Sequence, residues 1–154
     1  MFDHNDGFKE WLEGAPDLAV DFETCLLEVK LPELRRTRKE QHQCIMSNRK
    51  FGSKLPSNTV FDLLRSKGVK TVVNVHVRDC PTHPHGDSNI IQSFQNLVVR
   101  KLNWRKMDMG IEVLLQAVPE VEDLALYYSC NEEVLARWTG YEGLRRLKNV
   151  SRIS

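Results

Sequence analysis

The residues best suited to chemistry gather in one short stretch, Asp79-Cys80-Pro-Thr-His83-Pro-His85-Gly-Asp87, which holds a thiol, two imidazoles and two carboxylates. All of these groups can bind metal ions. However, His-x-His on a loop interrupted by proline is not a recognised ligand spacing by itself, and Asp87 can instead cap a helix. We therefore expect a solvated loop without a cofactor, in which Asp79, Cys80, His83 and His85 are no more than candidate metal ligands.

The next tripeptide in this stretch, Gly86-Asp87-Ser88, resembles the Gly-Asp-Ser nucleophile motif of one family of esterases and lipases. A serine nucleophile needs a histidine base. That family places its histidine near the C-terminus, whereas no histidine follows His85 in this chain. Neither of the glycine-rich patterns that cradle phosphates occurs. We expect a protein that is not an enzyme, and the alternative is a small α/β hydrolase or ligand-binding domain that uses the 79–88 loop.

Four aromatic residues in the second half of the chain could form a protein interaction surface: Trp104, Tyr127, Tyr128 and Trp138. Tryptophan and tyrosine are frequent among the residues that contribute most to binding at interfaces. Tyr127 falls on the face of its expected strand opposite to Leu124, Leu126 and Tyr128, because successive strand residues point to opposite faces. A partner surface on the Tyr127 face is one interpretation, and packing in the core is the other.

The elements that must position these residues repeat along the chain, since three expected strands share one pattern of apolar residues. From the central residue of each strand to the next there are 27 and then 22 positions, and a weaker fourth strand follows 26 positions later. Spacings in the low twenties are typical of leucine-rich repeats. The three copies of the pattern are Val72-x-x-Val75-x-Val77, Val99-x-x-Leu102-x-Trp104 and Val121-x-x-Leu124-x-Leu126, and the fourth strand is centred on Val150.

A helix of about ten residues is expected before each strand, with Asp87, Asp108 and Asn131 as candidate caps and Gly68 at the end of the first helix. Such an alternation implies parallel strand pairing. The sequence thus predicts an α/β fold in which parallel strands alternate with helices, as a degenerate leucine-rich-repeat-like array that is incomplete at the C-terminus. A doubly wound sheet is the alternative.

The first third of the chain carries weaker signals. A short helix is expected at about 7–13, and a strand is expected where Leu27, Val29 and Leu31 alternate with polar residues. The stretch 35–54 holds seven basic residues against Glu40. We therefore divide the chain into an N-terminal helix/strand segment with a basic linker, 1–56, and an α/β repeat-like domain, 57–154.

Composition limits the cellular context and the kinds of partner. The chain has 154 residues and a formal net charge of +1, with 28% charged residues, which is ordinary for a globular protein. The basic stretch 35–54 could contact nucleic acid, but no aromatic residue interleaves it before Phe51, so nucleic acid is not the expected partner. The four cysteines are widely spaced, and neither a secretory signal nor a membrane span is evident. We expect a cytoplasmic protein without membrane contact.

A family resemblance is carried by residues 102–108 (Leu-Asn-Trp-Arg-Lys-Met-Asp), 119–121, 124–129 (Leu-Ala-Leu-Tyr-Tyr-Ser), 131–138 (Asn-Glu-Glu-Val-Leu-Ala-Arg-Trp) and 142–144. These segments resemble the regulatory part of large fungal proteins that end in a subtilisin-like serine peptidase domain. The resemblance runs from about Val60 to Ser154, and the family usually has Ser-Gly-Asn where this chain has Ser129-Cys130-Asn131. None of the peptidase motifs occurs in this chain. The resemblance implies an upstream, non-catalytic regulatory module whose partner is another protein or an adjacent peptidase domain.

Overall fold

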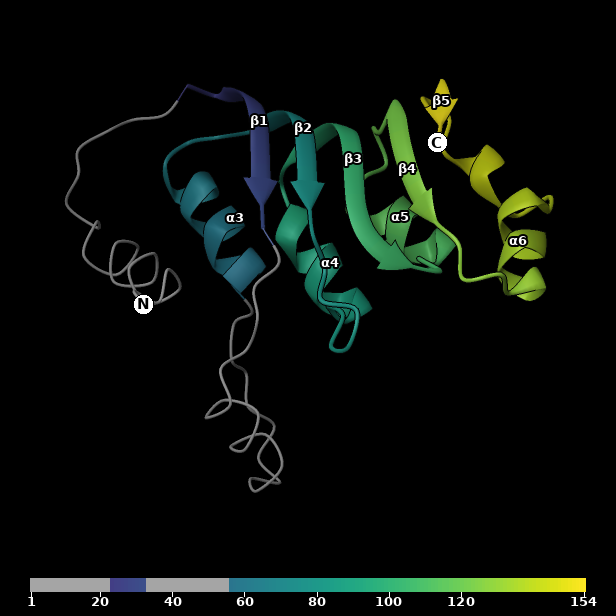
Figure 1. Cartoon of the computed structure of the whole chain (residues 1–154). Helices are drawn as coiled ribbons and strands as arrows, with labels where there is room; N and C mark the ends of the chain where they lie inside the picture. Colours follow the sequence, from purple (N-terminus) through teal and green to yellow (C-terminus); the bar gives the residue numbers. More distant parts are fainter. Residues whose placement is uncertain (1–22, 33–55) are drawn as a thin grey trace.

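Five parallel strands form one sheet in the computed structural model, which describes residues 23–32 and 56–154. The strands lie side by side in the order in which they occur in the sequence (Figure 1). The predicted α/β fold with parallel strands is therefore confirmed. The strands are β1 (Cys25–Leu31), β2 (Thr71–Val77), β3 (Val98–Met107), β4 (Asp123–Tyr127) and β5 (Arg152–Ile153).

Helices connect the strands from β1 onward, and the first three of them form a single layer. The helix α3 contacts α4, and α4 contacts α5 (Figure 1). Crossovers of one hand between consecutive parallel strands place their helices on the same face of the sheet. Because the strand order does not reverse, the described strands do not form the doubly wound alternative. The helices are α3 (Pro56–Ser66), α4 (Asp87–Phe94), α5 (Ile111–Ala117), α6 (Glu132–Thr139) and a short 3-10 helix, η1 (Leu144–Arg146).

The repeated apolar pattern determines which strand residues lie opposite one another. Val75 lies opposite Leu102, and Leu102 lies opposite Leu124. These residues are all buried between the sheet and the helix layer. The pattern that the sequence shows in β2, β3 and β4 is thus a set of aligned rows in the core. The other aligned core pairs of β2 and β3 are Val72 with Val99 and Val77 with Trp104.

The strand β1 carries the same pattern, which the sequence did not reveal. Its core positions are Leu26, Val29 and Leu31, which lie opposite Val72, Val75 and Val77. Leu27, which the sequence pattern groups with Val29 and Leu31, is instead 78% exposed. The strand also belongs to the segment 1–56, so the described sheet spans both of the expected regions. The expected helix at 7–13 and most of the basic linker lie outside the described residues.

Three aromatic rings tie the helix layer to the sheet. Phe61 of α3 contacts Phe94 of α4 with 5.0 Å between ring centroids, and Phe94 contacts Trp104 of β3 with 5.6 Å. Both contacts are edge to face, an arrangement that adds to the apolar burial. The rings of Phe61, Phe94 and Trp104 are almost completely buried. They fix the positions of α3 and α4 relative to β3.

Helix ends follow the sequence only in part. Asn131 caps α6 as predicted, since its side chain accepts a hydrogen bond from the Glu133 backbone N–H at 3.0 Å. Gly68 follows α3 with a φ of 86°, a conformation that favours glycine. The predicted caps at Asp87 and Asp108 are wrong, because glycines occupy the cap positions of α4 and α5.

No described helix has the length and apolar character needed to cross a membrane.

Candidate functional site

The sheet face opposite α3, α4 and α5 carries polar side chains in aligned rows, and we call it the open face. These side chains point away from the core because successive residues of a strand alternate between the two faces. Parallel pairing in register then places equivalent positions of neighbouring strands side by side, about 4.8 Å apart. The first row consists of Glu28, Asn74, Lys101, Asp123 and Arg152, and the second consists of Lys30, His76, Asn103 and Ala125.

The acidic residues of the first row are both paired. Glu28 accepts a hydrogen bond from Asn74 Nδ2 at 3.0 Å, and its carboxylate lies 2.7 Å from Lys30 Nζ. The hydrogen bond from Lys30 lowers the pKa of Glu28, although desolvation by the surrounding side chains acts in the opposite direction. Asp123 pairs with Arg152 at 2.6 Å. On the open face, Asp123 is therefore neutralised by Arg152 of the first row, and Glu28 is neutralised by Lys30 of the second row.

Tyr127 lies at the end of β4 next to the second row. Its hydroxyl group donates a hydrogen bond to Asn103 Oδ1 at 2.8 Å. The pairing of β3 and β4 is irregular between Asn103 and Met107, where the register shifts before Met107 pairs with Tyr127. The prediction that Tyr127 faces away from Leu124 is consistent with this contact, because Leu124 is completely buried and Asn103 belongs to the open face.

A groove of about 290 Å³ lies on the open face at the carboxyl ends of β1, β2 and β3. This edge is where open parallel sheets bind ligands. We call it the basic groove, because four of its lining residues are basic and none is acidic. It is lined by Lys30, Leu31, Pro32, His76, Val77, Arg78, Asn103 and Arg105.

The 79–88 loop follows β2 and is organised around the carboxylate of Asp79. This carboxylate is almost completely buried and accepts hydrogen bonds from the backbone N–H groups of Cys80 and His85. The indole Nε1–H of Trp104 donates to Asp79 Oδ2 at 2.9 Å, and Nδ1 of His85 lies 2.6 Å from Asp79 Oδ1. The ring of His85 also packs edge to face against Trp104, with 5.4 Å between centroids. We call these contacts the Asp79 network.

The Asp79 network stabilises the charged form of its carboxyl group. Burial raises the pKa of Asp79, but the hydrogen bonds from His85 and Trp104 outweigh burial and hold the pKa below its ordinary value of 3.8. Since a carboxylate can only accept, Nδ1 of His85 donates to it. The other ring nitrogen, Nε2, is buried and has no hydrogen-bond partner among the described residues. It cannot reach a substrate in this conformation, so the network positions the loop rather than forming an exposed acid-base pair.

The side chains of the other candidate metal ligands, Cys80 and His83, contact Thr82 rather than the Asp79 carboxylate. Cys80 Sγ lies 3.3 Å from the Thr82 hydroxyl group, and His83 Nδ1 lies 3.0 Å from the same oxygen. Asp87 pairs instead with Lys106. Within 23–32 and 56–154, no group of three or more His, Cys, Asp or Glu residues is arranged to hold a metal ion.

The four aromatic candidates for a partner surface divide between core and surface. Trp104 is 1% exposed and Trp138 is 6% exposed, and the indole of Trp138 donates to the Met109 carbonyl oxygen at 2.9 Å. Both indoles therefore serve the core, which corrects their assignment to a surface. Tyr128 is partly buried and packs against Trp138. Tyr127 is the one of the four that contacts the open face.

Two features near this face were not recognised in the sequence. The first feature is the pair of polar rows, which are formed by the outward-facing residues of each repeat. The sequence signal for them was the polar residues that lie between the apolar positions of the repeated pattern. Asp108 joins the ends of β3 and β4, because its carboxylate accepts hydrogen bonds from the backbone and hydroxyl groups of Ser129. Cys130 adopts a φ of 66° in the segment that follows β4.

No known protein family, curated protein or solved structure matches the chain.

Proposed function

We propose that the chain is a non-enzymatic, leucine-rich-repeat-like module that binds a protein partner through the open face. The observation that carries this proposal is the one-sided arrangement of the sheet. The helices α3, α4 and α5 cover one face, and the other presents polar rows together with Tyr127. Repeat arrays characteristically use such extended faces for binding.

The biological role within this proposal is regulatory. The resemblance to segments upstream of subtilisin-like peptidase domains supports a partner that is either such an adjacent domain or a separate protein. The four cysteines are widely spaced in the sequence, which supports a cytoplasmic site of action. The polar rows and Tyr127 offer side chains for contacts along an extended surface, so binding rather than catalysis is the activity that we propose.

Selection of peptide ligands against the full chain tests the position of the binding face. Peptides from a random display library are selected on the wild-type protein, and their affinities are then measured by biolayer interferometry. We expect Tyr127→Ala combined with Asn103→Ala to weaken the selected peptides by about tenfold or more, as for a residue that contributes strongly to an interface. Melting temperatures confirm that the variants are folded.

A matched control combines Tyr141→Ala with Gln116→Ala, which removes the same kinds of side chain from other surfaces. Tyr141 is 84% exposed after α6, and Gln116 is exposed on α5. Selected peptides that bind the open-face variant and the control variant equally well would contradict the proposal. The alternative, a ligand-binding domain that uses the 79–88 loop, predicts instead that His83→Ala weakens binding.

A further inference from the structure

The charges on the open face are separated along the direction of the strands. The first row contains both of the acidic residues of the two rows, Glu28 and Asp123, and each is paired with a base. Farther along the strands, toward their carboxyl ends, the basic groove has no acidic residue among those that line it. The groove therefore presents positive charge that the neighbouring row only partly compensates.

Two arginines of the basic groove have no ionic partner within residues 23–32 and 56–154. Arg78 directly follows β2, and Arg105 lies in β3 next to Trp104, the residue opposite Val77. Both side chains are exposed, and neither makes a hydrogen bond or ion pair with another described residue. By contrast, Lys30 and His76 both lie close to the carboxylate of Glu28. In the described part of the chain, the two arginines are thus the cations of the groove that no carboxylate neutralises.

Two arginines that line one exposed groove favour a ligand with carboxylates. A guanidinium binds a carboxylate through two parallel hydrogen bonds, and such charge-assisted bonds are about twice as strong as neutral ones. Two like charges on adjacent strands also repel one another until an anion lies near them. Asn103 in the same groove can donate to a peptide carbonyl group or accept from a peptide N–H group.

The shape and lining of the groove favour a peptide over single-stranded nucleic acid. Proteins that bind single strands stack bases on aromatic side chains. None of the eight lining residues is phenylalanine, tyrosine or tryptophan. The groove is also open to solvent and continuous with the polar rows, which suits an extended polypeptide. We propose that the basic groove binds an acidic peptide segment of a partner protein, with Arg78 and Arg105 as the residues that contact its carboxylates.

This inference rests on the proposed function and can be tested separately from it. The full chain is titrated into two fluorescein-labelled decapeptides, one rich in Asp and Glu and the other with Asn and Gln at the same positions. Fluorescence anisotropy reports binding at low and moderate salt. We expect the acidic peptide to bind at least about tenfold more tightly than the amide peptide, and its affinity to fall as salt is raised.

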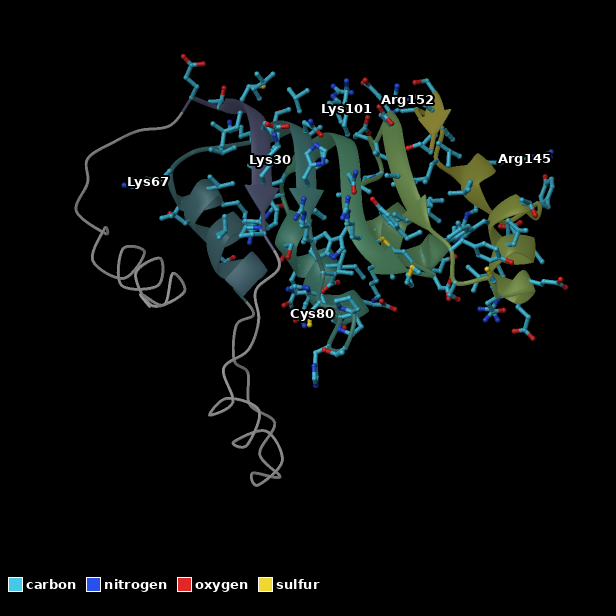
Figure 2. The ribbon with its side chains drawn as sticks, viewed as in Figure 1. Lys30, Lys67, Cys80, Lys101, Arg145 and Arg152 are labelled. Carbon is cyan, nitrogen blue, oxygen red and sulfur yellow. The ribbon has the colours of Figure 1, made fainter. Side chains whose placement is uncertain are left out.

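Charge reversal then assigns the contact to the groove. We expect Arg78→Glu combined with Arg105→Glu to weaken the acidic peptide by about tenfold or more, because a like charge replaces each guanidinium. The control combines Arg145→Glu with Lys148→Glu, which changes the net charge equally at the opposite end of the molecule. Figure 2 shows Lys30 beside β1 and Arg145 beyond β5. Affinity within about twofold of wild type is expected for this control.

Three results would overturn the inference. Equal affinity for the acidic and amide peptides would remove carboxylate recognition, and equal weakening by both charge-reversal pairs would show a response to net charge alone. The groove would be a nucleic-acid site if a labelled single-stranded oligonucleotide bound more tightly than the acidic peptide and if the Arg78→Glu, Arg105→Glu variant lost that binding. Arg78→Gln with Arg105→Gln repeats the test if charge reversal lowers the melting temperature. If one of these three results is found while Tyr127→Ala with Asn103→Ala still weakens the library-selected peptides, this inference is wrong and the proposed function stands.

Discussion

Removal of the Asp79 carboxylate should reduce the stability of the fold far more than removal of another acidic residue from the same loop. Asp79→Ala leaves the buried indole N–H of Trp104 without an acceptor, and it also removes the acceptor of His85 and of two backbone N–H groups. An unsatisfied buried donor costs about 1–3 kcal/mol, and hydrogen bonds to charged groups contribute about 1.5–3 kcal/mol each. Because the contacts share one carboxylate and are not additive, we expect a total loss of about 3–5 kcal/mol.

Urea unfolding followed by tryptophan fluorescence measures this loss directly. The expected change is a large part of the roughly 5–15 kcal/mol that a domain of this size has in total. The control is Asp87→Ala, since Asp87 belongs to the same loop but its side chain is 59% exposed where it pairs with Lys106. An exposed pair contributes about 0–1 kcal/mol. A loss for Asp79→Ala no greater than that for Asp87→Ala would refute the reasoning.

A double-mutant cycle with Trp104→Phe separates the hydrogen bond from general damage to the loop. Phenylalanine keeps an aromatic ring in the core but has no N–H group. In the wild-type background, Trp104→Phe removes a donor from Asp79, whereas in the Asp79→Ala background it removes an unsatisfied buried donor. We therefore expect Trp104→Phe to cost at least about 1 kcal/mol less in the Asp79→Ala background. Equal costs in both backgrounds would show that the indole N–H and the carboxylate do not act together.

Two further predictions concern pH and backbone conformation. The pKa of Asp79 lies below its ordinary value of 3.8 in the folded protein. Its contribution to stability is therefore fully present well above that value and is lost as the pH falls through the lower pKa of the folded state. The urea midpoints of wild type and Asp79→Asn should accordingly move closer together as the pH is lowered below 3.8, and a constant difference would contradict this. Cys130 has a φ of 66°. A residue in this left-handed conformation costs about 1–2 kcal/mol unless it is glycine, and the extra unfolded-state entropy of glycine offsets part of that gain. Cys130→Gly should therefore raise the free energy of unfolding by about 0.5–1 kcal/mol in the same assay, whereas Cys130→Ala should not; equal stability of the two variants would contradict this.

The strands could be predicted from the sequence because the apolar pattern that identifies each one lies within a few consecutive residues. Apolar residues such as Val75, Leu102 and Leu124 recur in one pattern, and the structure aligns them in one row of the core. The cap at Asn131 and the glycine at position 68 are equally local signals, and both were found. The strand β1 carries the same pattern but lies far from β2 in the sequence, so spacing alone did not connect it to the others.

The site depends on contacts between residues that are distant in the sequence, and these contacts have no local signal. Trp104 looked like an interface residue by its type, but it is buried because its indole completes the hydrogen bonding of Asp79, 25 positions away. Asp108 looked like a helix cap, but its carboxylate instead joins Ser129 of the next repeat. The basic groove likewise exists only once β1, β2 and β3 are aligned. Strand register, rather than residue type, determines which charges become neighbours.

The end of β2 connects stability with binding, because Arg78 and Asp79 are consecutive residues that point to opposite faces. Arg78 lines the basic groove on the open face, and Asp79 is buried with Trp104. Trp104 is in turn followed by Arg105, so the hydrogen bond between Asp79 and Trp104 joins the two backbones directly behind the two arginines. A variant that weakens this bond but stays folded should therefore lower acidic-peptide affinity through the spacing of Arg78 and Arg105. Exchange of Asp87, whose carboxylate pairs with Lys106 away from both arginines, should leave that affinity unchanged.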